Sequence, residues 1–338
     1  MSVTMVAIDV GASRTRIRVG EDPSDFDAPD GPMIRDIGSA TALMDLLREV
    51  RADIAPHASV YLSGGIAAPP LGGDERVMTN WREDGRISIS AIRELGYDRV
   101  ELMNDLEAAA HGLVALLQQE SRSGEIVAFD GASIPETGNR ALVIPGSGLG
   151  SAGIVDLGER HDPVWKVVPT EVGHATAGWQ EHDELLERVG GYLGHPPTWE
   201  DCVSGPGLEN LWAAGGDPAG DAGEGPLGAP EIAMLAASGD ARARNALEHY
   251  YLLAARFAQV LALSFLSTGG LYLAGGSTRS NAPLIPEAGF LRAFRENPRM
   301  ADVLEEIPVF LVLAEINLLG PWQLGWRRLA RPMPPRRG

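Results

Sequence analysis

The sequence predicts an α/β protein of two domains, and three observations support this fold class. The chain has 338 residues, which exceeds the size at which a single hydrophobic core stays convenient. Its first third alternates strand-like and helix-like segments, the order typical of α/β folds. Two segments in different halves also share one plan: an apolar strand, a glycine turn and a second strand. This similarity indicates a weak internal repeat.

The first of these hairpins is the opening stretch IDVGASRTRIRVG, residues 8–20. A P-loop would require a lysine and a helix after the glycines, and a dinucleotide fold would require G-x-G-x-x-G before a helix. Apolar and polar residues alternate after this turn, so a second strand is expected instead. The turn at Gly11 is a candidate to hold phosphate with its backbone N–H groups, and Asp9 beside it suits that role chiefly if Mg²⁺ or its waters intervene. The alternative is an ordinary hairpin with an exposed aspartate.

The segments between the two hairpins continue the alternation of strands and helices. In order, they are an acidic loop over residues 21–32, a helix over 39–52, a strand over 58–70 that two prolines end, and a helix that begins near Asn104. On this last helix we expect an apolar stripe facing a core, formed by Leu106, Ala109, Ala110, Leu113, Leu116 and Leu117. The interval over residues 123–140 is polar and turn-rich, and the second hairpin follows it.

The second hairpin covers residues 141–158 and contains GLGSAG, which is formally a G-x-G-x-x-G pattern. The helix that would hold a pyrophosphate is missing after it, so a dinucleotide site is not expected. The later elements are a surface loop over residues 213–230, helices between Pro230 and Leu266, a strand over 270–276, a strand over 307–315 and a short helix over 318–330.

Charge and composition exclude several classes of protein. A net charge of −18 argues against a nucleic-acid-binding or anionic-membrane surface, since those partners require a positive field. The single cysteine, Cys202, excludes an intramolecular disulfide and a cysteine-based zinc site, and we expect it to be buried. The most hydrophobic segment, residues 250–266, carries Arg256 and Gln259, which favours a buried helix over a membrane span. With no signal peptide apparent in the first residues, we expect a cytoplasmic protein.

Two polar groupings are candidates for chemistry on a sugar. Asp105 is expected in the first turn of a helix that Asn104 caps, where the helix dipole favours an ionised carboxylate. Such a carboxylate could accept the proton of a sugar hydroxyl that attacks a γ-phosphate, although it could also be a plain helix-start acid. Glu171 and His174, with Gly173 permitting a tight turn, could bind vicinal hydroxyls. A zinc site is the weaker alternative, because no further histidine or cysteine stands at ligand spacing.

Taken in order, these segments resemble the bacterial glucokinase family, which comprises hexokinase-like enzymes of the actin, sugar kinase and Hsp70 ATPase fold. The matching stretches cover nearly the whole chain and include DVGASRTRIRV, GGIAAPP, MTNW, LMNDLEAAAHGL, IPGSGLGSA, EVGHAT, EDCVSGPGLENLW, LYLAGG, FLRAFRENPRMADVLEEIPVFLV and LLG. The resemblance implies a two-domain actin-like (ribonuclease H-like) fold with an interdomain cleft. It places residues 1–112 and 318–338 in a smaller α/β domain and residues 113–317 in a larger α/β domain that closes over glucose.

The resemblance also implies an activity: phosphoryl transfer from MgATP to the 6-hydroxyl of glucose, at the entry to glycolysis, by a homodimer. Asp105 would be the catalytic base. The sugar would be bound by Asn104, Asp105, Glu171, His174 and Glu200. The nucleotide would be bound by Asp9, Gly11, Ala12, Ser13, Gly146, Ser147, Gly148, Gly275 and Gly276, with Mg²⁺ held by Asp9 through water.

The first phosphate loop departs from the family pattern. Where the family usually has Gly-Gly-Thr-Asn, this chain has Gly11, Ala12, Ser13 and Arg14. Arg14 either compensates charge near the phosphates or points into solvent, and the changes bear on nucleotide affinity and on the choice of phosphoryl donor. In the second loop Ser147 replaces the usual threonine, and Val172 stands where a glycine is common. A sugar-binding regulator with little catalysis on the same fold, or a kinase of a related hexose, is the alternative function.

Overall fold

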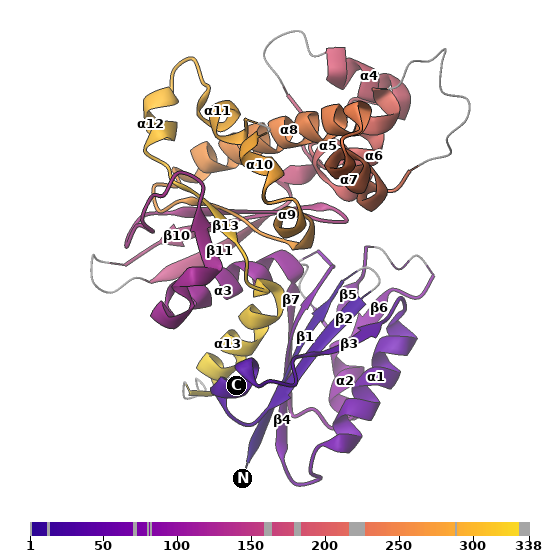
Figure 1. Ribbon diagram of the computed structural model, residues 1–338. Helices are drawn as coiled ribbons and strands as arrows, with labels where there is room; N and C mark the ends of the chain where they lie inside the picture. Colours follow the sequence, from indigo (N-terminus) through magenta and orange to yellow (C-terminus); the bar gives the residue numbers. More distant parts are fainter. Residues whose placement is uncertain are drawn as a thin grey trace. The chain divides into compact units, whose positions relative to one another are not determined.

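The computed structural model describes residues 2–11, 14–69, 73–79, 81, 83–158, 164–178, 184–215, 227–287 and 289–330. The chain divides into two compact units (Figure 1). Unit 1 comprises Met1–Ser123 and Glu315–Gly338, and unit 2 comprises Gly124–Ala314. Each unit contains a sheet and helices, so the predicted α/β class is confirmed.

The sheet of unit 1 has the strand order β3-β2-β1-β4-β7. Its strands are β1 (Val3–Val10), β2 (Arg14–Gly20), β3 (Met33–Asp36), β4 (Ser59–Ile66) and β7 (Arg99–Asn104). Strands β1 and β2 pair in antiparallel register, which confirms the first predicted hairpin, and β3 continues the antiparallel arrangement. Strands β1, β4 and β7 are parallel, so their carboxyl ends meet at one edge of the sheet. A separate two-stranded sheet pairs β5 (Glu75–Val77) with β6 (Arg86–Ser88).

Helices cover both faces of this sheet (Figure 1). On one face, alternate residues of β1, such as Val6 and Ile8, pack in a cluster with residues of α1 (Ala40–Asp53) and α2 (Ile89–Glu94). On the other face, Met5 and Ala7 pack against α13 (Ile316–Ala330). Because side chains alternate along a strand, Asp9 faces the same side as Met5 and Ala7, toward α13.

Helix α3 (Asp105–Leu117) lies directly against α13. A Cβ at Gly112 would stand 2.0 Å from the carbonyl oxygen of Ile316, and one at Gly320 would stand 1.8 Å from that of Ala108. The predicted apolar stripe on α3 is too narrow, because Ala108, Val114 and Ala115 outside it are also buried. The contact with α13, which approaches from a distant part of the chain, explains this wider burial.

The acidic segment over residues 21–32 contains a short 3₁₀ helix, η1 (Pro23–Asp27), and folds around Arg18. This arginine is 4% exposed and donates hydrogen bonds to the Asp25 carbonyl oxygen at 2.7 Å and to the Asp30 carboxylate at 2.8 Å. It also donates to the carbonyl oxygens of Ala28 and Gly31. The segment is therefore organised by a buried cation together with the capping box of η1, in which the Asp22 carboxylate accepts the N–H of Ser24 and the Asp25 carboxylate accepts the N–H of Asp22.

The sheet of unit 2 has the strand order β11-β10-β9-β12-β13-β8. Its strands are β8 (Ile126–Ala128), β9 (Arg140–Pro145), β10 (Leu149–Asp156), β11 (Trp165–Thr170), β12 (Leu271–Leu273) and β13 (Val309–Val312). The antiparallel pair β9 and β10 confirms the second hairpin, and the formal dinucleotide pattern lies largely in β10, after which the next element among the described residues is the strand β11. The polar, turn-rich interval over 123–140 also contains β8, a strand that the sequence did not predict, because its pairing with β13 leaves no signal in an alternation of only three residues.

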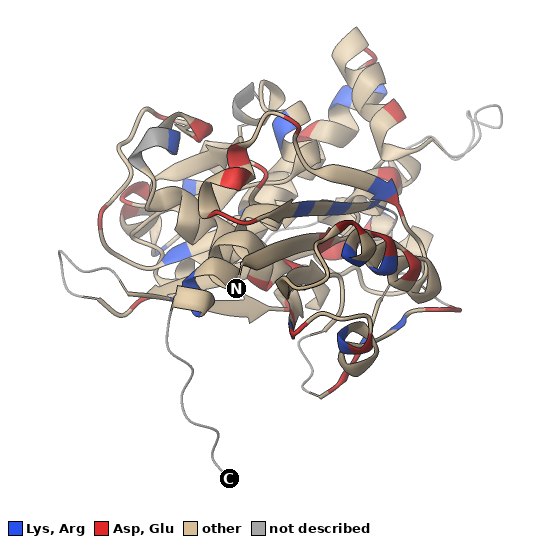
Figure 2. Cartoon of the chain, turned by 90° about the horizontal axis from the view of Figure 1, so that it is seen from below, with Lys and Arg blue, Asp and Glu red and all other residues tan. Residues whose placement is uncertain are grey.

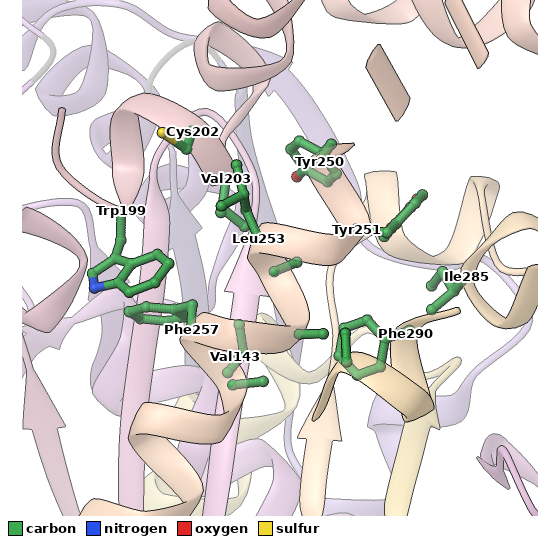
Figure 3. Packing of buried hydrophobic residues seen from close by; sticks show 14 of the residues in the cluster. Val143, Trp199, Cys202, Val203, Tyr250, Tyr251, Leu253, Phe257, Ile285 and Phe290 are labelled. Atoms are coloured by element: carbon green, nitrogen blue, oxygen red, sulfur yellow. The ribbon is translucent and has the colours of Figure 1, made fainter. Parts of the chain in front are cut away.

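Helices of unit 2 gather around the long helix α8 (Ala241–Phe265). The others are α4 (Glu184–Leu193), α5 (Glu200–Val203), α6 (Gly205–Ala214), α7 (Ala229–Ser238), α9 (Gly276–Ser280), α10 (Leu284–Glu287), α11 (Phe290–Arg295) and α12 (Ala301–Glu305). Unit 2 also contains the short 3₁₀ helix η3 (Val172–His174), and a second one, η2 (Glu120–Glu125), spans the boundary between the two units in the sequence. Figure 3 shows the core on α8, with Trp199, Phe257 and Cys202 labelled. The ring centroids of Trp199 and Phe257 are 5.8 Å apart, and Cys202 is buried.

The hydrophobic segment at residues 250–266 lies almost entirely in α8, and two of its polar residues form hydrogen bonds inside unit 2. Arg256 pairs with Glu296 at 2.7 Å, and Gln259 donates to the carbonyl oxygen of Phe294 at 2.7 Å. The prediction of a buried helix is confirmed. Among the described residues, no helix is long and apolar enough to cross a membrane.

The Gly- and Ala-rich segment over residues 213–230 begins in the last residues of α6 and ends at the start of α7, and its part over 216–226 lies outside the described residues. Elsewhere, Lys and Arg lie interspersed with more numerous Asp and Glu (Figure 2), as the net charge of −18 requires. An anion bound to this chain therefore needs a cation or backbone N–H groups placed close to it.

Candidate active site

The carboxyl edge of the unit 1 sheet collects the polar residues that the sequence singled out there. Asp9 and Gly11 lie at the end of β1, and Asn104 and Asp105 lie at the end of β7. The Asn104 amide donates to the carbonyl oxygen of Ala68, just past β4, at 2.9 Å. Ligands of open α/β sheets bind characteristically at such an edge.

Asp105 is the first residue of α3, and Asn104 is its N-cap. The Asn104 Oδ1 atom accepts the N–H groups of Leu106 at 2.9 Å and Glu107 at 3.4 Å, which confirms the predicted cap. Asn104 is 8% exposed, and one of its two amide hydrogens is already bonded to Ala68. Its main effect is therefore to fix the start of α3, and with it the place of Asp105, where the helix dipole favours a negative charge.

Asp9 is only 4% exposed, so the alternative of an ordinary hairpin with an exposed aspartate is wrong. Its partner across the hairpin is Arg16, whose Nη1 atom donates to Asp9 Oδ2 at 2.8 Å. Glu315, next to the start of α13, lies 4.0 Å from the same guanidinium. Burial raises the pKa of the Asp9 carboxyl, and the neighbouring Arg16 opposes that rise.

The residues around Asp9 fit one mode of magnesium binding. One carboxylate oxygen is taken by Arg16, and no group of three His, Cys, Asp or Glu in the described part of the chain could hold a metal ion. Mg²⁺ is usually held by few carboxylates, several waters and substrate phosphates, so a single water-mediated contact from Asp9 is compatible with it. Nothing in the same described residues supports the zinc alternative. Ala12 and Ser13 lie outside the described residues.

In unit 2, the structure brings together the three residues expected to bind sugar hydroxyls. His174 lies between two carboxylates: its Nε2 atom is 3.7 Å from Glu171 Oε2, and its Nδ1 atom is 3.7 Å from Glu200 Oε1. The side chains of Glu171 and His174 are each 62% exposed, and that of Glu200 is 32% exposed. They form an accessible polar set of acceptors and donors, which is the chemistry that vicinal hydroxyls require.

Backbone contacts hold this set in place. Leu149 donates its N–H to Glu200 Oε2 at 2.8 Å, and a Cβ at Gly148 would stand 2.6 Å from that same oxygen. A Cβ at Gly173 would stand 2.6 Å from the carbonyl oxygen of Leu149. Gly173 is thus required by a close backbone approach to β10, which corrects the sequence interpretation of a turn requirement.

The segment around His174 also lies beside the segment that precedes α5. Ala177 donates its N–H to the Pro197 carbonyl oxygen at 2.8 Å, and Trp199 donates to that of Ala175 at 3.1 Å. These bonds bring Glu200 next to His174 although 26 positions separate them (200 minus 174).

The glycine turns expected to serve the nucleotide in unit 2 are also neighbours. Gly146 donates its N–H to the Gly148 carbonyl oxygen at 2.8 Å, which closes the turn between β9 and β10, and Ser147 at its tip is exposed. Ser277, in the first turn of α9, donates to the carbonyl oxygen of Pro145 at 2.8 Å. Gly275 precedes α9 with φ of 103°, a conformation that favours glycine.

A cavity of about 210 Å³ opens between α7, α8 and α10 of unit 2. It is lined by Ala236, Ala237, Arg244, Leu247, Glu248, Tyr251 and Leu284. Leu284 follows Asn281, the C-cap residue of α9, by only three positions. The cavity has apolar walls with one cation and one carboxylate.

Sequence reasoning missed several residues of these sites. Arg16 could have been found, because it lies opposite Asp9 once the hairpin register is assumed. Leu149 and Ser277 act through a backbone N–H and a hydroxyl, respectively, and their residue types carry no signal for such roles.

Residues 6–322 match the family model described as Glucokinase. The chain belongs to the glucokinase family. This glucokinase-family chain is 32% identical over 278 residues to the glucokinase of Yersinia pseudotuberculosis, covering 80% of each chain. It is 28% identical over 315 residues to the bifunctional protein glk of Burkholderia lata, covering 91% of this chain but 46% of that protein. It therefore spans about half the length of the latter relative.

Solved structures similar to this glucokinase-family chain confirm the predicted two-domain actin-like fold. The glucokinase of Balamuthia mandrillaris in complex with glucose matches with a TM-score of 0.78 at 22% identity, covering 96% of this chain and 94% of that one. A ROK family glucokinase from Streptomyces griseus in complex with glucose and AMPPNP matches with a TM-score of 0.60 at 18% identity, covering 96% of this chain and 99% of that one. A ROK family transcriptional regulator, a homologue of the E. coli MLC protein, matches with a TM-score of 0.63 at 14% identity, covering 96% of this chain and 78% of that one.

Proposed function

We propose that this chain is a hexose kinase that transfers the γ-phosphoryl group of MgATP to the 6-hydroxyl of glucose. The observation that carries the proposal is the position of Asp105, the first residue of a helix whose start is fixed by a buried asparagine cap. Family membership and the glucose and AMPPNP complexes of related folds support the choice of substrates. A cytoplasmic homodimer that acts in glycolysis is the expectation for the family.

In the proposed reaction, the 6-hydroxyl oxygen of the sugar forms a bond to the γ-phosphorus, and Asp105 accepts the hydroxyl proton. The bond from that phosphorus to the oxygen bridging it to the β-phosphate breaks, and ADP leaves with the electron pair. Glu171, His174 and Glu200 bind the other ring hydroxyls, with Glu200 oriented by the Leu149 N–H group. Binding through several hydroxyls orients the sugar for the reaction.

The glycine turns are proposed to hold the nucleotide. The N–H groups of Gly11 and Gly146 are bonded within their own turns, so the other N–H groups of the two turns, such as those of Ser147 and Gly148, are proposed to bind phosphates, while Gly275 and Gly276 take the adenosine. The cavity beyond α9 offers apolar walls for the nucleoside base. When bound, Mg²⁺ would neutralise charge on the phosphate oxygens, and Asp9 would contact it through water.

The test is a coupled assay with glucose and MgATP that detects ADP and glucose 6-phosphate. We expect Asp105→Asn to lower kcat by about 10²- to 10⁴-fold, the usual contribution of a positioned general base, while glucose still binds. Asp45→Asn is the matched control, because Asp45 lies on the surface of α1 and is 61% exposed. Turnover of Asp105→Asn at the wild-type rate would refute the assignment of the base.

A sugar-binding regulator is the second candidate function. The departure of the first phosphate loop at Ala12, where the family pattern has a glycine, favours it, and a transcriptional regulator shares the fold. Glucose binding without transfer from any nucleotide or polyphosphate would establish this alternative. Comparing kcat/KM for glucose, mannose and glucosamine would decide whether a related hexose is the better substrate.

A further inference from the structure

Strand β2 carries three arginines at alternate positions, Arg14, Arg16 and Arg18, which therefore share one face. Since Arg18 pairs with Ala7 of β1, which packs against α13, this is the α13 side of the sheet. The contacts that these arginines make with acceptor groups become fewer toward the hairpin turn. Arg18 is buried and donates to the Asp30 carboxylate and several carbonyl oxygens, and Arg16 donates to the buried Asp9 at 2.8 Å.

Arg14 makes the weakest contacts of the three. Its side chain is 61% exposed, and its acidic neighbour is Asp36, 3.9 Å away and 89% exposed. An ion pair this long and this exposed contributes little free energy. The guanidinium can therefore turn toward another anion at little cost.

The position of Arg14 suits an anion at the first glycine turn. Gly11 donates its N–H to the carbonyl oxygen of Arg14 at 3.0 Å, so Arg14 is the residue at which the chain enters β2. Within the described part of the chain, the charges in contact with this end of the hairpin include Asp9, Asp36 and Glu315, which repel phosphate, and Arg16, which donates to Asp9. A phosphate bound there needs a further cation, and Arg14 supplies it.

We propose that Arg14 binds the terminal phosphate of the phosphoryl donor and thereby sets the preference for donors with a polyphosphate chain. This inference rests on the proposed function. A guanidinium suits the role because its planar fork donates two parallel hydrogen bonds to a phosphate, which an asparagine or a lysine does not reproduce. An asparagine, which is usual at this position in the family pattern, carries no positive charge.

The experiment measures equilibrium binding of ATP, tripolyphosphate, AMP and glucose to the full chain with Mg²⁺, at low and high salt, together with KM for ATP and for glucose. We expect Arg14→Asn to weaken ATP and tripolyphosphate binding by about 10- to 100-fold, the effect of losing hydrogen bonds to a charged group. Affinity for AMP and glucose should not change, and the salt dependence of ATP binding should decrease. Arg14→Lys should recover only part of the affinity.

Arg35→Asn is the matched control, because Arg35 is exposed on β3 opposite Thr15, on the other face of the same sheet. Equal ATP affinity in the wild type and Arg14→Asn would overturn the inference and leave the proposed function intact. Parallel losses for ATP, AMP and glucose would overturn it as well, since they would indicate a general structural defect. If the wild type binds neither ATP nor tripolyphosphate, the inference and the proposed function both fail.

Discussion

Replacing Gly148 by alanine is expected to weaken hexose binding far more than it weakens the fold. The new methyl group would stand 2.6 Å from Glu200 Oε2, the oxygen that accepts the Leu149 N–H at 2.8 Å. A carboxylate at the end of a partly exposed side chain yields more easily than backbone does. The substitution should therefore push Glu200 away from Leu149 and from His174.

The magnitude follows from the contact that is lost. A hydrogen bond to a charged group contributes about 1.5–3 kcal/mol, and about 1.4 kcal/mol corresponds to a tenfold change in an equilibrium constant. If Glu200 binds sugar only when it is oriented by Leu149, the affinity for glucose should fall by about 10- to 100-fold. The free energy of unfolding should fall by only about 1 kcal/mol, because the displaced carboxylate moves into water.

The assay is titration of glucose against the intrinsic tryptophan fluorescence of Gly148→Ala, Glu200→Gln and the double variant, with thermal unfolding of each. The two single losses should not add in the double variant, because both act on the same carboxylate. Gly191→Ala is the control, since a Cβ at Gly191 meets no atom within 4 Å. A Gly148→Ala protein that unfolds normally and binds glucose with wild-type affinity would show that this contact does not prepare Glu200 for sugar.

Two further predictions concern α3. Gly112→Ala should lower the free energy of unfolding by about 3 kcal/mol or more, because its methyl group would stand 2.0 Å from the Ile316 carbonyl oxygen, whereas Gly38→Ala, with open space, should leave the unfolding temperature unchanged. Burial, assisted by the nearby Arg328, lowers the pKa of His111 to about 4 from its usual 6.5. The unfolded chain therefore binds this proton first as the pH falls from 6.5 to 4, and stability should drop by up to about 3 kcal/mol over that range. Denaturant unfolding across this range should show a smaller drop for His111→Gln, and an equal drop would contradict the assignment.

Local patterns were sufficient for much of the fold and for parts of the site. The period of two after Gly11 predicted the first hairpin, and the sequence around Asn104 predicted both the cap and the start of α3. Both signals arise from residues close together in the chain, where backbone geometry and capping act over a few positions. Hairpin partners such as Asp9 and Arg16 also belong to this local class.

Contacts between distant segments were beyond such reasoning. The near-complete burial of α3 depends on α13, which is about 200 positions away in the chain, and β8 is a strand because β13 pairs with it. Glu200 reaches His174 only through the pairing of two loop segments, and Gly148 and Gly173 are glycines because other atoms approach them there. None of these neighbours leaves a periodic signal in the sequence.

The sequence by itself determined which residue types could meet a phosphate and a sugar, and the two strand-turn-strand frames that carry several of them. The tertiary structure alone decided their environments: it buried Asp9 against Arg16, left Arg14 exposed at the entrance to β2, and set Glu200 beside His174. The physical reason is that secondary structure follows from interactions over a few residues. Burial and charge pairing, in contrast, depend on which distant segments pack together.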